Sequence, residues 1–386
     1  MSWSTVRADQ FCTLITDGTH DSPKPQQSGW KLITSKHLKG HYIDFDSANW
    51  ISEADYLKVI SRSAVEQWDI LFSMIGTIGN IYLEKNSHVE YACKNMGIFK
   101  FSGNKENALW MYYYLKSPQA KAYIQTHLRG STQAYVPLGG LREMPVPVPP
   151  QSVRNEIIAV LRPIDEKIEC NNAINDNLQQ QAAALFSSLY DRSNTEVRFT
   201  DLIQILGGGT PKTGENTYWN GNIAFFTPKD VGTPYTLITE KTISKEGLSH
   251  CNSRLYPVNT VFVTARGTVG KGGMSGVPMA MNQSCYALVG KETHQLLVYF
   301  YTLKAVDRLK HKASGAVFDA ITTRDFESEQ IMKLSDDDAT AFLRVAEPMF
   351  QEVLNNNIEN LRLSTLRDSL LPKLMSGEID VSAVQL

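Results

Sequence analysis

The feature that most constrains the fold of this chain is a heptad pattern that occurs twice, 185 residues apart. In each copy, residues recur at alternating spacings of three and four, which is typical of a coiled-coil helix. The first copy comprises Leu161, Ile164, Ile168, Asn171, Asn175, Leu178, Ala182, Leu185 and Leu189. The second comprises Ala346, Met349, Val353, Asn356, Asn360, Leu363, Arg367, Leu370 and Leu374. We therefore expect two long helices that bury these seams.

Each seam carries two asparagines where apolar residues normally lie, namely Asn171 and Asn175 in the first and Asn356 and Asn360 in the second. A buried asparagine weakens a coiled coil, and its best-attested use is to fix the register and the partner. If the two helices pair antiparallel, the numbers of facing residues sum to about 531. Asn171 should then lie near Asn360 and Asn175 near Asn356, and we predict that these four side chains set the register.

The regions before the two helices also repeat, at a distance of about 191 residues. The stretch "DGTHDSP" (17–23) matches "GGTPKT" (208–213), and "IGTIGN" (75–80) matches "RGTVGK" (266–271). The order of these motifs is the same in both halves. We predict two globular domains and two long helices, with boundaries at 1–150, 151–190, 191–335 and 336–386.

Within each globular half, short apolar runs such as "DILFSMIG" and "NTVFVTARG" are typical of strands. Helical stretches at 106–128 and 294–313 interrupt these strands. We therefore predict the fold class α/β, in the sense of mixed α+β domains. Trp110 and Tyr112–Tyr114 could form a base-stacking platform, but within an apolar helix they are better explained as core. Antiparallel pairing of the long helices predicts pseudo-twofold symmetry.

Composition excludes several other classes of protein. The five cysteines include no CxxC pair, which argues against zinc and for reduced thiols in the cytoplasm. No apolar run reaches the roughly 18 residues of a membrane span. His37 and His41 have metal-ligand spacing but no nearby third ligand, so we interpret them as surface residues near a turn.

Familiar catalytic motifs also fail. "ARGTVGKGG" lacks the first glycine and the final Ser/Thr of a phosphate-binding loop. No Asp/Asn-Pro-Pro-aromatic loop and no Glu-x-Lys is present. We expect no catalytic residues, and we interpret Gly76, Gly79, Gly267 and Gly270 as parts of turns that hold unusual backbone conformations.

The repeat motifs resemble those of the specificity subunits of type I restriction-modification systems. The resemblance covers nearly the whole chain and rests on "GGGTPKTGENTYWNGNIAFFTPKDV" (207–231), its divergent counterpart at 17–38, the GT-[IV]-G turns and "LLPKLMSGEIDV" (370–381). It implies a non-catalytic reader of double-stranded DNA. In this family two target recognition domains each read half of a bipartite, asymmetric site, and the coiled coil docks methyltransferase subunits and a restriction/translocase subunit.

The same resemblance implies that S-adenosylmethionine, ATP and magnesium belong to the partner subunits, and that this chain holds no cofactor or metal. For DNA contacts we favour polar and basic residues beside the repeated motifs, with Arg266 as the best base reader because arginine can bond guanine bidentately. The predicted contacts are Thr19, His20, Lys36, Lys39, Thr210, Lys212, Thr213, Lys229, Arg266 and Lys271. The alternative is that they are ordinary loop side chains.

Two other functions stay open at this point: a coiled-coil adaptor that never touches DNA, and a standalone DNA methyltransferase or nuclease. The chain also departs from the family pattern. Its second half has "SEQIMKLS" (328–335) where the first has the proline-rich "MPVPVPP" (144–150), and Arg367 stands in the second seam where Ala182 stands in the first. We therefore expect the second helix to be docked less regularly.

Overall fold

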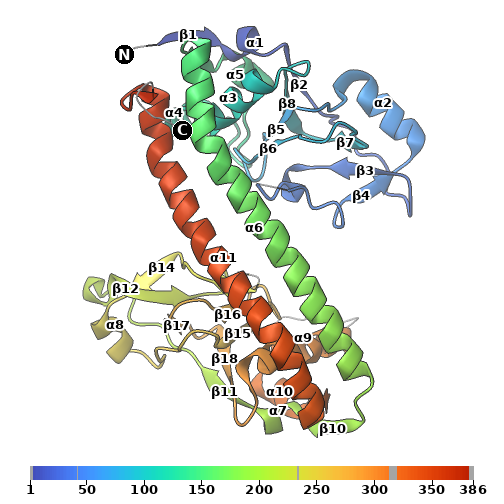
Figure 1. Cartoon of the computed structure of the whole chain (residues 1–386), viewed down its shortest axis with the longest axis vertical. Helices are drawn as coiled ribbons and strands as arrows, with labels where there is room; N and C mark the ends of the chain where they lie inside the picture. The colour runs from blue at the N-terminus through green and yellow to red at the C-terminus, as the bar shows by residue number, and fades with distance from the viewer. Residues whose placement is uncertain (1–2, 41, 233, 313–319, 382–386) are drawn as a thin grey trace. The chain divides into compact units, whose positions relative to one another are not determined.

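The computed structural model describes residues 3–40, 42–232, 234–312 and 320–381 (Figure 1). The chain divides into two compact units: unit 1 comprises Met1–Glu169 with Arg362–Leu386, and unit 2 comprises Cys170–Leu361. Two 41-residue helices, α6 (Gln151–Asp191) and α11 (Asp336–Ser376), each contribute one segment to both units. The structure is thus a mixed α and β fold with long helices where the heptad seams predict them.

Unit 1 contains a two-stranded sheet β1-β9, a four-stranded sheet β2-β8-β5-β6 and a three-stranded sheet β4-β3-β7. The strands are β1 (Ser4–Arg7), β2 (Leu14–Asp17), β3 (Trp30–Ile33), β4 (Asn49–Ile51), β5 (Ile70–Ser73), β6 (Ile81–Leu83), β7 (Tyr91–Cys93), β8 (Met96–Lys100) and β9 (Pro145–Val148). The helices are α1 (Ala8–Phe11), the 3-10 helix η1 (Ser35–His37), α2 (Glu53–Ser63), α3 (Lys105–Lys116), α4 (Pro118–Thr126) and α5 (Leu138–Glu143).

The core of unit 1 forms where α3 packs against the four-stranded sheet and the long helices. Trp110 and the three tyrosines that follow Met111 are buried there, which confirms that this run is core rather than a stacking platform. The stretch 106–128 is helical as predicted, and it consists of two helices, α3 and α4. Ser117 ends α3 and caps α4, because Pro118 lacks the backbone N–H that would continue α3.

Unit 2 contains the sheets β10-β19, β11-β18-β15-β16-β13 and β14-β12-β17. Its strands are β10 (Thr195–Arg198), β11 (Ile203–Gly207), β12 (Trp219–Phe226), β13 (Tyr235–Thr236), β14 (Lys241–Ile243), β15 (Val261–Thr264), β16 (Gly272–Ser275), β17 (Met279–Met281), β18 (Cys285–Gly290) and β19 (Gln330–Lys333). Its helices are α7 (Phe199–Leu202), the 3-10 helix η2 (Asn216–Tyr218), α8 (Lys245–Ser249), α9 (Gln295–Lys312) and α10 (Thr323–Ser328). Apart from β13, the sheets repeat those of unit 1 strand for strand.

The proline-rich segment of the first half and its unlike counterpart in the second form the same element. Strand β9 pairs antiparallel with β1, with Val6 opposite Val146. Strand β19 pairs antiparallel with β10, with Val197 opposite Ile331. Strands β9 and β19 each pair with one neighbouring strand only, so part of their backbone N–H groups have no partner strand to bond. A proline, which has no N–H, is therefore tolerated in β9, although β19 contains none.

The four seam asparagines meet in unit 2. Asn171 Nδ2 donates to Asn360 Oδ1 at 2.9 Å, and Asn356 Nδ2 donates to Asn175 Oδ1 at 2.9 Å. Residues 170–191 of α6 and 336–361 of α11 therefore run antiparallel, with the pairs expected from the constant sum. Whether these amides select the register in solution stays a prediction.

Two further asparagines extend this group. Asn175 Nδ2 donates to Asn357 Oδ1 at 3.0 Å, and Asn360 Nδ2 donates to Asn172 Oδ1 at 2.9 Å. These two bonds are equivalent under the 185-residue repeat, so the six amides form two matching chains. Asn171 also donates to the Glu359 carboxylate at 2.8 Å, a contact without a counterpart because the repeat places Ile174 there. We call the six asparagines the amide layer.

Candidate nucleic-acid interface

In unit 1, four loops that begin at the ends of β2, β3, β5 and β7 contact one another through their backbones. The Thr19 N–H donates to the Cys93 carbonyl at 2.9 Å, and the Lys94 N–H donates to the Ile33 carbonyl at 2.9 Å. Thr77 Oγ1 donates to the Ser35 carbonyl at 3.2 Å. These contacts bring both predicted motifs of the first half together. Loop cluster 1 comprises residues 18–22, 34–40, 74–80 and 94–95.

Unit 2 builds the same arrangement from the ends of β11, β12, β15 and β17. The Gly209 N–H donates to the Met281 carbonyl at 3.1 Å, and the Asn282 N–H donates to the Phe226 carbonyl at 3.0 Å. Thr268 Oγ1 donates to the Pro228 carbonyl at 3.2 Å. This bond is the counterpart of the one that Thr77 makes with Ser35 in unit 1. Loop cluster 2 comprises residues 208–213, 227–231, 265–271 and 282–284.

The glycine turns in both clusters have the backbone conformation predicted for them. The φ angles are +78° at Gly76, +88° at Gly79, +83° at Gly267 and +72° at Gly270, a region that residues with a Cβ rarely adopt. The N–H of the second glycine donates a hydrogen bond to the backbone carbonyl of the last residue of the preceding strand. The donor–acceptor distance is 3.0 Å in unit 1 and 2.9 Å in unit 2. Between the glycines, Ile78 and Val269 pack against the cores of their units, so the turn is anchored to the domain.

A second pair of turns differs in chemistry between the units. In unit 2 the Thr227 N–H donates to the Asp230 carboxylate at 2.8 Å, whereas in unit 1 the Thr34 N–H donates to His37 Nδ1 at 2.9 Å. His37 is buried, so the expectation that it lies at the surface was wrong; His41 lies outside the described residues. Burial, followed by the charge of Lys36, lowers the pKa of His37, which favours the neutral ring that can accept this bond.

The predicted contacts of unit 1 all lie in loop cluster 1. His20 is exposed and bonds Asn95 Oδ1 and the Asp17 carboxylate, both at 2.8 Å. Thr19 Oγ1 accepts from the backbone of Asp21, so this hydroxyl shapes the turn. The two predicted cations, Lys36 and Lys39, are exposed. Lys39 Nζ donates to the backbone carbonyl of Lys36 at 2.9 Å.

The predicted contacts of unit 2 all lie in loop cluster 2. Thr210 hydrogen-bonds Gln283, and Lys229 lies 3.6 Å from the Glu240 carboxylate while staying mostly exposed. Four others are exposed and, within the described part of the chain, form no ion pair; they are Lys212, Thr213, Arg266 and Lys271. The structure thus brings each set of sequence-predicted residues together in its own unit.

Sequence reasoning missed the loops after β7 and β17. Asn95 holds His20, Lys94 contacts Ser22, and Gln283 holds Thr210, so these side chains belong to the same surfaces. The short runs "CKNM" and "MNQSC" that carry them have few identical residues, so the repeat search could not align them. Their common position between paired strands is visible only in the fold.

The described residues contain no group of three or more His, Cys, Asp or Glu side chains arranged to hold a metal ion. Within the same residues, none of the helices has the length and apolar character needed to cross a membrane. All five cysteines are free thiols.

Comparison with known proteins identifies the family. The family model for the type I restriction modification DNA specificity domain matches residues 3–180 and again residues 192–333. The chain belongs to this family. A specificity subunit of this kind recognises DNA sequence and is not itself catalytic, so the matches do not favour a DNA-independent adaptor or a standalone methyltransferase or nuclease.

The relatives of this specificity subunit are distant, and they match between half and most of its length. It is 22% identical to the type I restriction enzyme HindI specificity subunit of Haemophilus influenzae, over 85% of this chain and 90% of that protein. It is 25% identical to the EcoR124I/EcoR124II specificity subunit of Escherichia coli, over 51% of each. The fold is similar to a crystal structure of the type I S subunit from M. genitalium, with a TM-score of 0.56, 14% identity and coverage of 97% and 96% of the two chains.

Proposed function

We propose that this specificity subunit reads a bipartite, asymmetric DNA site, with loop cluster 1 on one half-site and loop cluster 2 on the other. The observation that carries the proposal is that one backbone arrangement occurs twice with different side chains on it. Equivalent positions of the glycine turns hold Ile75 and Arg266 before the first glycine, and Asn80 and Lys271 after the second. Two like frames with unlike surfaces suit two different half-sites.

We assign base reading first to Arg266, whose exposed guanidinium can bond the N7 and O6 atoms of guanine. The exposed Lys36, Lys212 and Lys271 suit phosphates, which position a protein on DNA without reading its sequence. His20, fixed by Asn95 and Asp17, suits a base edge or a phosphate. These contacts, like those of Thr19, Lys39, Thr210, Thr213 and Lys229, are proposals.

We further propose that the partners are methyltransferase subunits and a restriction/translocase subunit, because the named relatives are parts of restriction enzymes. S-adenosylmethionine, ATP and magnesium would then bind to those partner subunits. The complex would work in the cytoplasm. In this proposal residues 1–150 and 191–335 are separable recognition domains, and the helices at 151–190 and 336–386 form the docking surface.

The experiment that tests this function is methylation mapping of a genome in cells that carry the chain with its methyltransferase subunits. We expect one methylated bipartite motif with two unlike halves, absent from cells that lack the chain. Methylation at unrelated sequences, or at a single uninterrupted motif, would refute the proposal.

A further inference from the structure

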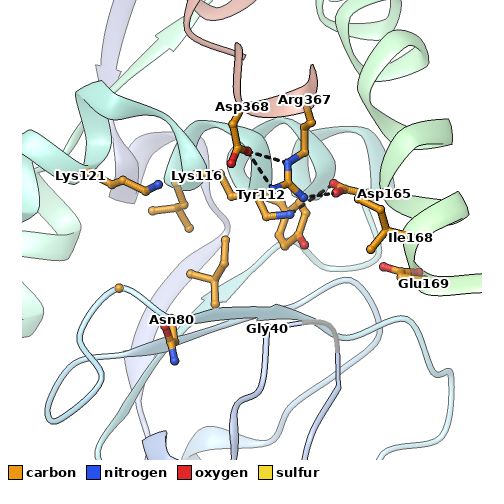
Figure 2. A pocket seen from close by; sticks show the side chains of 13 residues that line it. Gly40, Asn80, Tyr112, Lys116, Lys121, Asp165, Ile168, Glu169, Arg367 and Asp368 are labelled. Atoms are coloured by element: carbon orange, nitrogen blue, oxygen red, sulfur yellow. Dashed lines mark hydrogen bonds and ion pairs between the residues drawn. The ribbon is translucent and has the colours of Figure 1, made fainter. Parts of the chain in front are cut away.

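A buried charged cluster joins α3 of unit 1 to the unit 1 segments of both long helices. Lys116 Nζ of α3 lies 3.3 Å from Asp165 Oδ2 of α6, and Arg367 Nη1 of α11 lies 2.7 Å from Asp165 Oδ1. The side chains are 23%, 10% and 17% exposed for Lys116, Asp165 and Arg367. Figure 2 shows Arg367 reaching Asp165 while also contacting Asp368. Arg367 thus fits the seam through an ion pair.

The cluster holds one shared anion between two cations. Burial alone would raise the pKa of Asp165, but Lys116 and Arg367 lower it below its ordinary value. Burial, together with the charge of Arg367, lowers the pKa of Lys116. The removal of one member of such a group leaves a buried charge with an incomplete set of partners, so the remaining side chains must move toward water.

The repeat has no such cluster at the equivalent place in unit 2. The 185-residue repeat puts Phe350 at the position of Asp165 and Ala182 at the position of Arg367. The ring of Phe350 packs against Phe300 and Tyr299, with centroids 5.5 and 5.8 Å apart. Aromatic packing tolerates small shifts, whereas hydrogen-bonded ions fix a geometry.

The charged cluster and the glycine turn of loop cluster 1 line the same cavity. This cavity has a volume of about 380 Å³, and its lining includes Lys116, Asp165 and Arg367 together with Gly79 and Asn80. Figure 2 shows Asn80 across the cavity from Arg367 and Asp165. Because Lys116 belongs to α3, the ion pairs hold the body of unit 1, of which loop cluster 1 is a part, against the unit 1 segments of the long helices.

We propose that Asp165 and Arg367 are positioning residues for DNA reading: they hold loop cluster 1 in one orientation against the long helices and so set the spacer length that the unit 1 half-site requires. This inference rests on the proposed function. In unit 2 the equivalent contact between α11 and α9 is the aromatic packing of Phe350 against Tyr299 and Phe300, which does not depend on ions.

The test uses the full chain with its methyltransferase subunits and duplexes that carry the mapped wild-type motif with its natural spacer, or with one base pair added or removed. Arg367→Ala should lower the preference for the natural spacer on the order of tenfold, or ~1.4 kcal/mol. Arg367→Lys, which keeps the charge, should restore part of that preference. Arg362→Ala, at an exposed position of the same helix, is the matched control and should not change it.

A second variant separates positioning from stability. Asp165→Phe and Arg367→Ala copy the residues of unit 2 at these two positions, and Lys116→Met removes the third charge, so that no buried ion is left without a partner. This triple variant should fold with a melting temperature close to that of the wild type and still show the relaxed spacer preference. A wild-type spacer preference in this triple variant and in Arg367→Ala would overturn the inference. If the wild-type complex itself shows no bipartite motif, the proposed function fails instead, so the two failures are distinguishable.

Discussion

At the residue scale, the two loop clusters show how one backbone can carry different chemistry. The Thr34 and Thr227 turns have the same geometry, yet one is closed by an imidazole and the other by a carboxylate. The glycine turns likewise share their positive φ angles, but Ile75 and Asn80 of one turn correspond to Arg266 and Lys271 of the other. Specificity and pH response can therefore change by substitution while the frame stays constant.

Arg266→Ala should relax specificity at one base pair of the unit 2 half-site, with a loss of about 1–3 kcal/mol in discrimination at that position. Competition gel shifts with single-base variants of the mapped motif measure this loss. Arg344→Ala, at an exposed position of α11, is the control and should leave discrimination intact. A uniform loss of affinity across all variants would show that Arg266 contacts phosphate instead.

Unit 1 should lose stability in mild acid because of His37. Its folded pKa is lowered, so the unfolded chain takes up a proton near the ordinary value of about 6.5, whereas the folded chain resists protonation until lower pH. The free energy of unfolding should thus be constant above this value and fall as pH drops toward the folded pKa. Melting temperatures of the full chain at pH 7.5 and 5.5 test it.

His37→Asp, which copies the turn of unit 2, should reduce that loss of melting temperature. His88→Gln, at an exposed position, should keep it. An equal pH dependence in the wild type and His37→Asp would assign the effect to other groups.

At the element scale, the long helices, the repeat and the pairs Asn171–Asn360 and Asn175–Asn356 could be predicted from sequence, because spacing and repetition are visible in one dimension. The break at Ser117, the roles of Asn172 and Asn357 and the Asp165–Arg367 pair could not, since each depends on a neighbour distant in the chain. Predicted contact residues were found on shared surfaces because they flank repeated motifs.

The detailed alignment of the motifs shows the same limit. Sequence aligns Thr19 with Thr210, but Thr19 donates to Cys93 and Gly209 donates to Met281, the last residues of β7 and β17. The fold therefore aligns Thr19 with Gly209, one residue away. Strand register decides this, and a shared Gly-Thr pair does not report it.

The amide layer leads to a prediction for the long helices. Replacement of Asn171, Asn175, Asn356 and Asn360 by Leu together should keep or raise the melting temperature and loosen spacer discrimination, since apolar seams are more stable but less selective. Asn175→Leu alone should instead cost about 1–3 kcal/mol, because the buried Asn356 amide loses its acceptor. Thermal denaturation and spacer-variant methylation assays measure both effects, and a destabilised quadruple variant would contradict the first.

At the scale of the whole molecule, the tandem repeat should make recognition modular. Exchange of residues 1–150 for the same region of another family member should change only one half of the methylated motif. Methylation mapping reads out both halves at once. A simultaneous change in both halves would argue against independent recognition domains.

The pure chain should transfer no methyl group from S-adenosylmethionine to DNA, because the family to which it belongs supplies recognition rather than catalysis. A radiolabel transfer assay with and without the methyltransferase subunits tests this. Activity of the chain alone would contradict the assignment.

The close approach of backbones inside the loop clusters has a practical consequence for anyone who wishes to retarget this protein. A Cβ placed at Gly18 would lie 2.3 Å from the Cys93 carbonyl oxygen, and one at Gly208 would lie 2.2 Å from that of Asn282. Random libraries should therefore leave these two codons fixed and diversify their exposed neighbours, such as His20 and Lys212. Most clones would then keep the backbone arrangement of the loop clusters. Selection could act on DNA-binding preference, because few clones would be lost through misfolding.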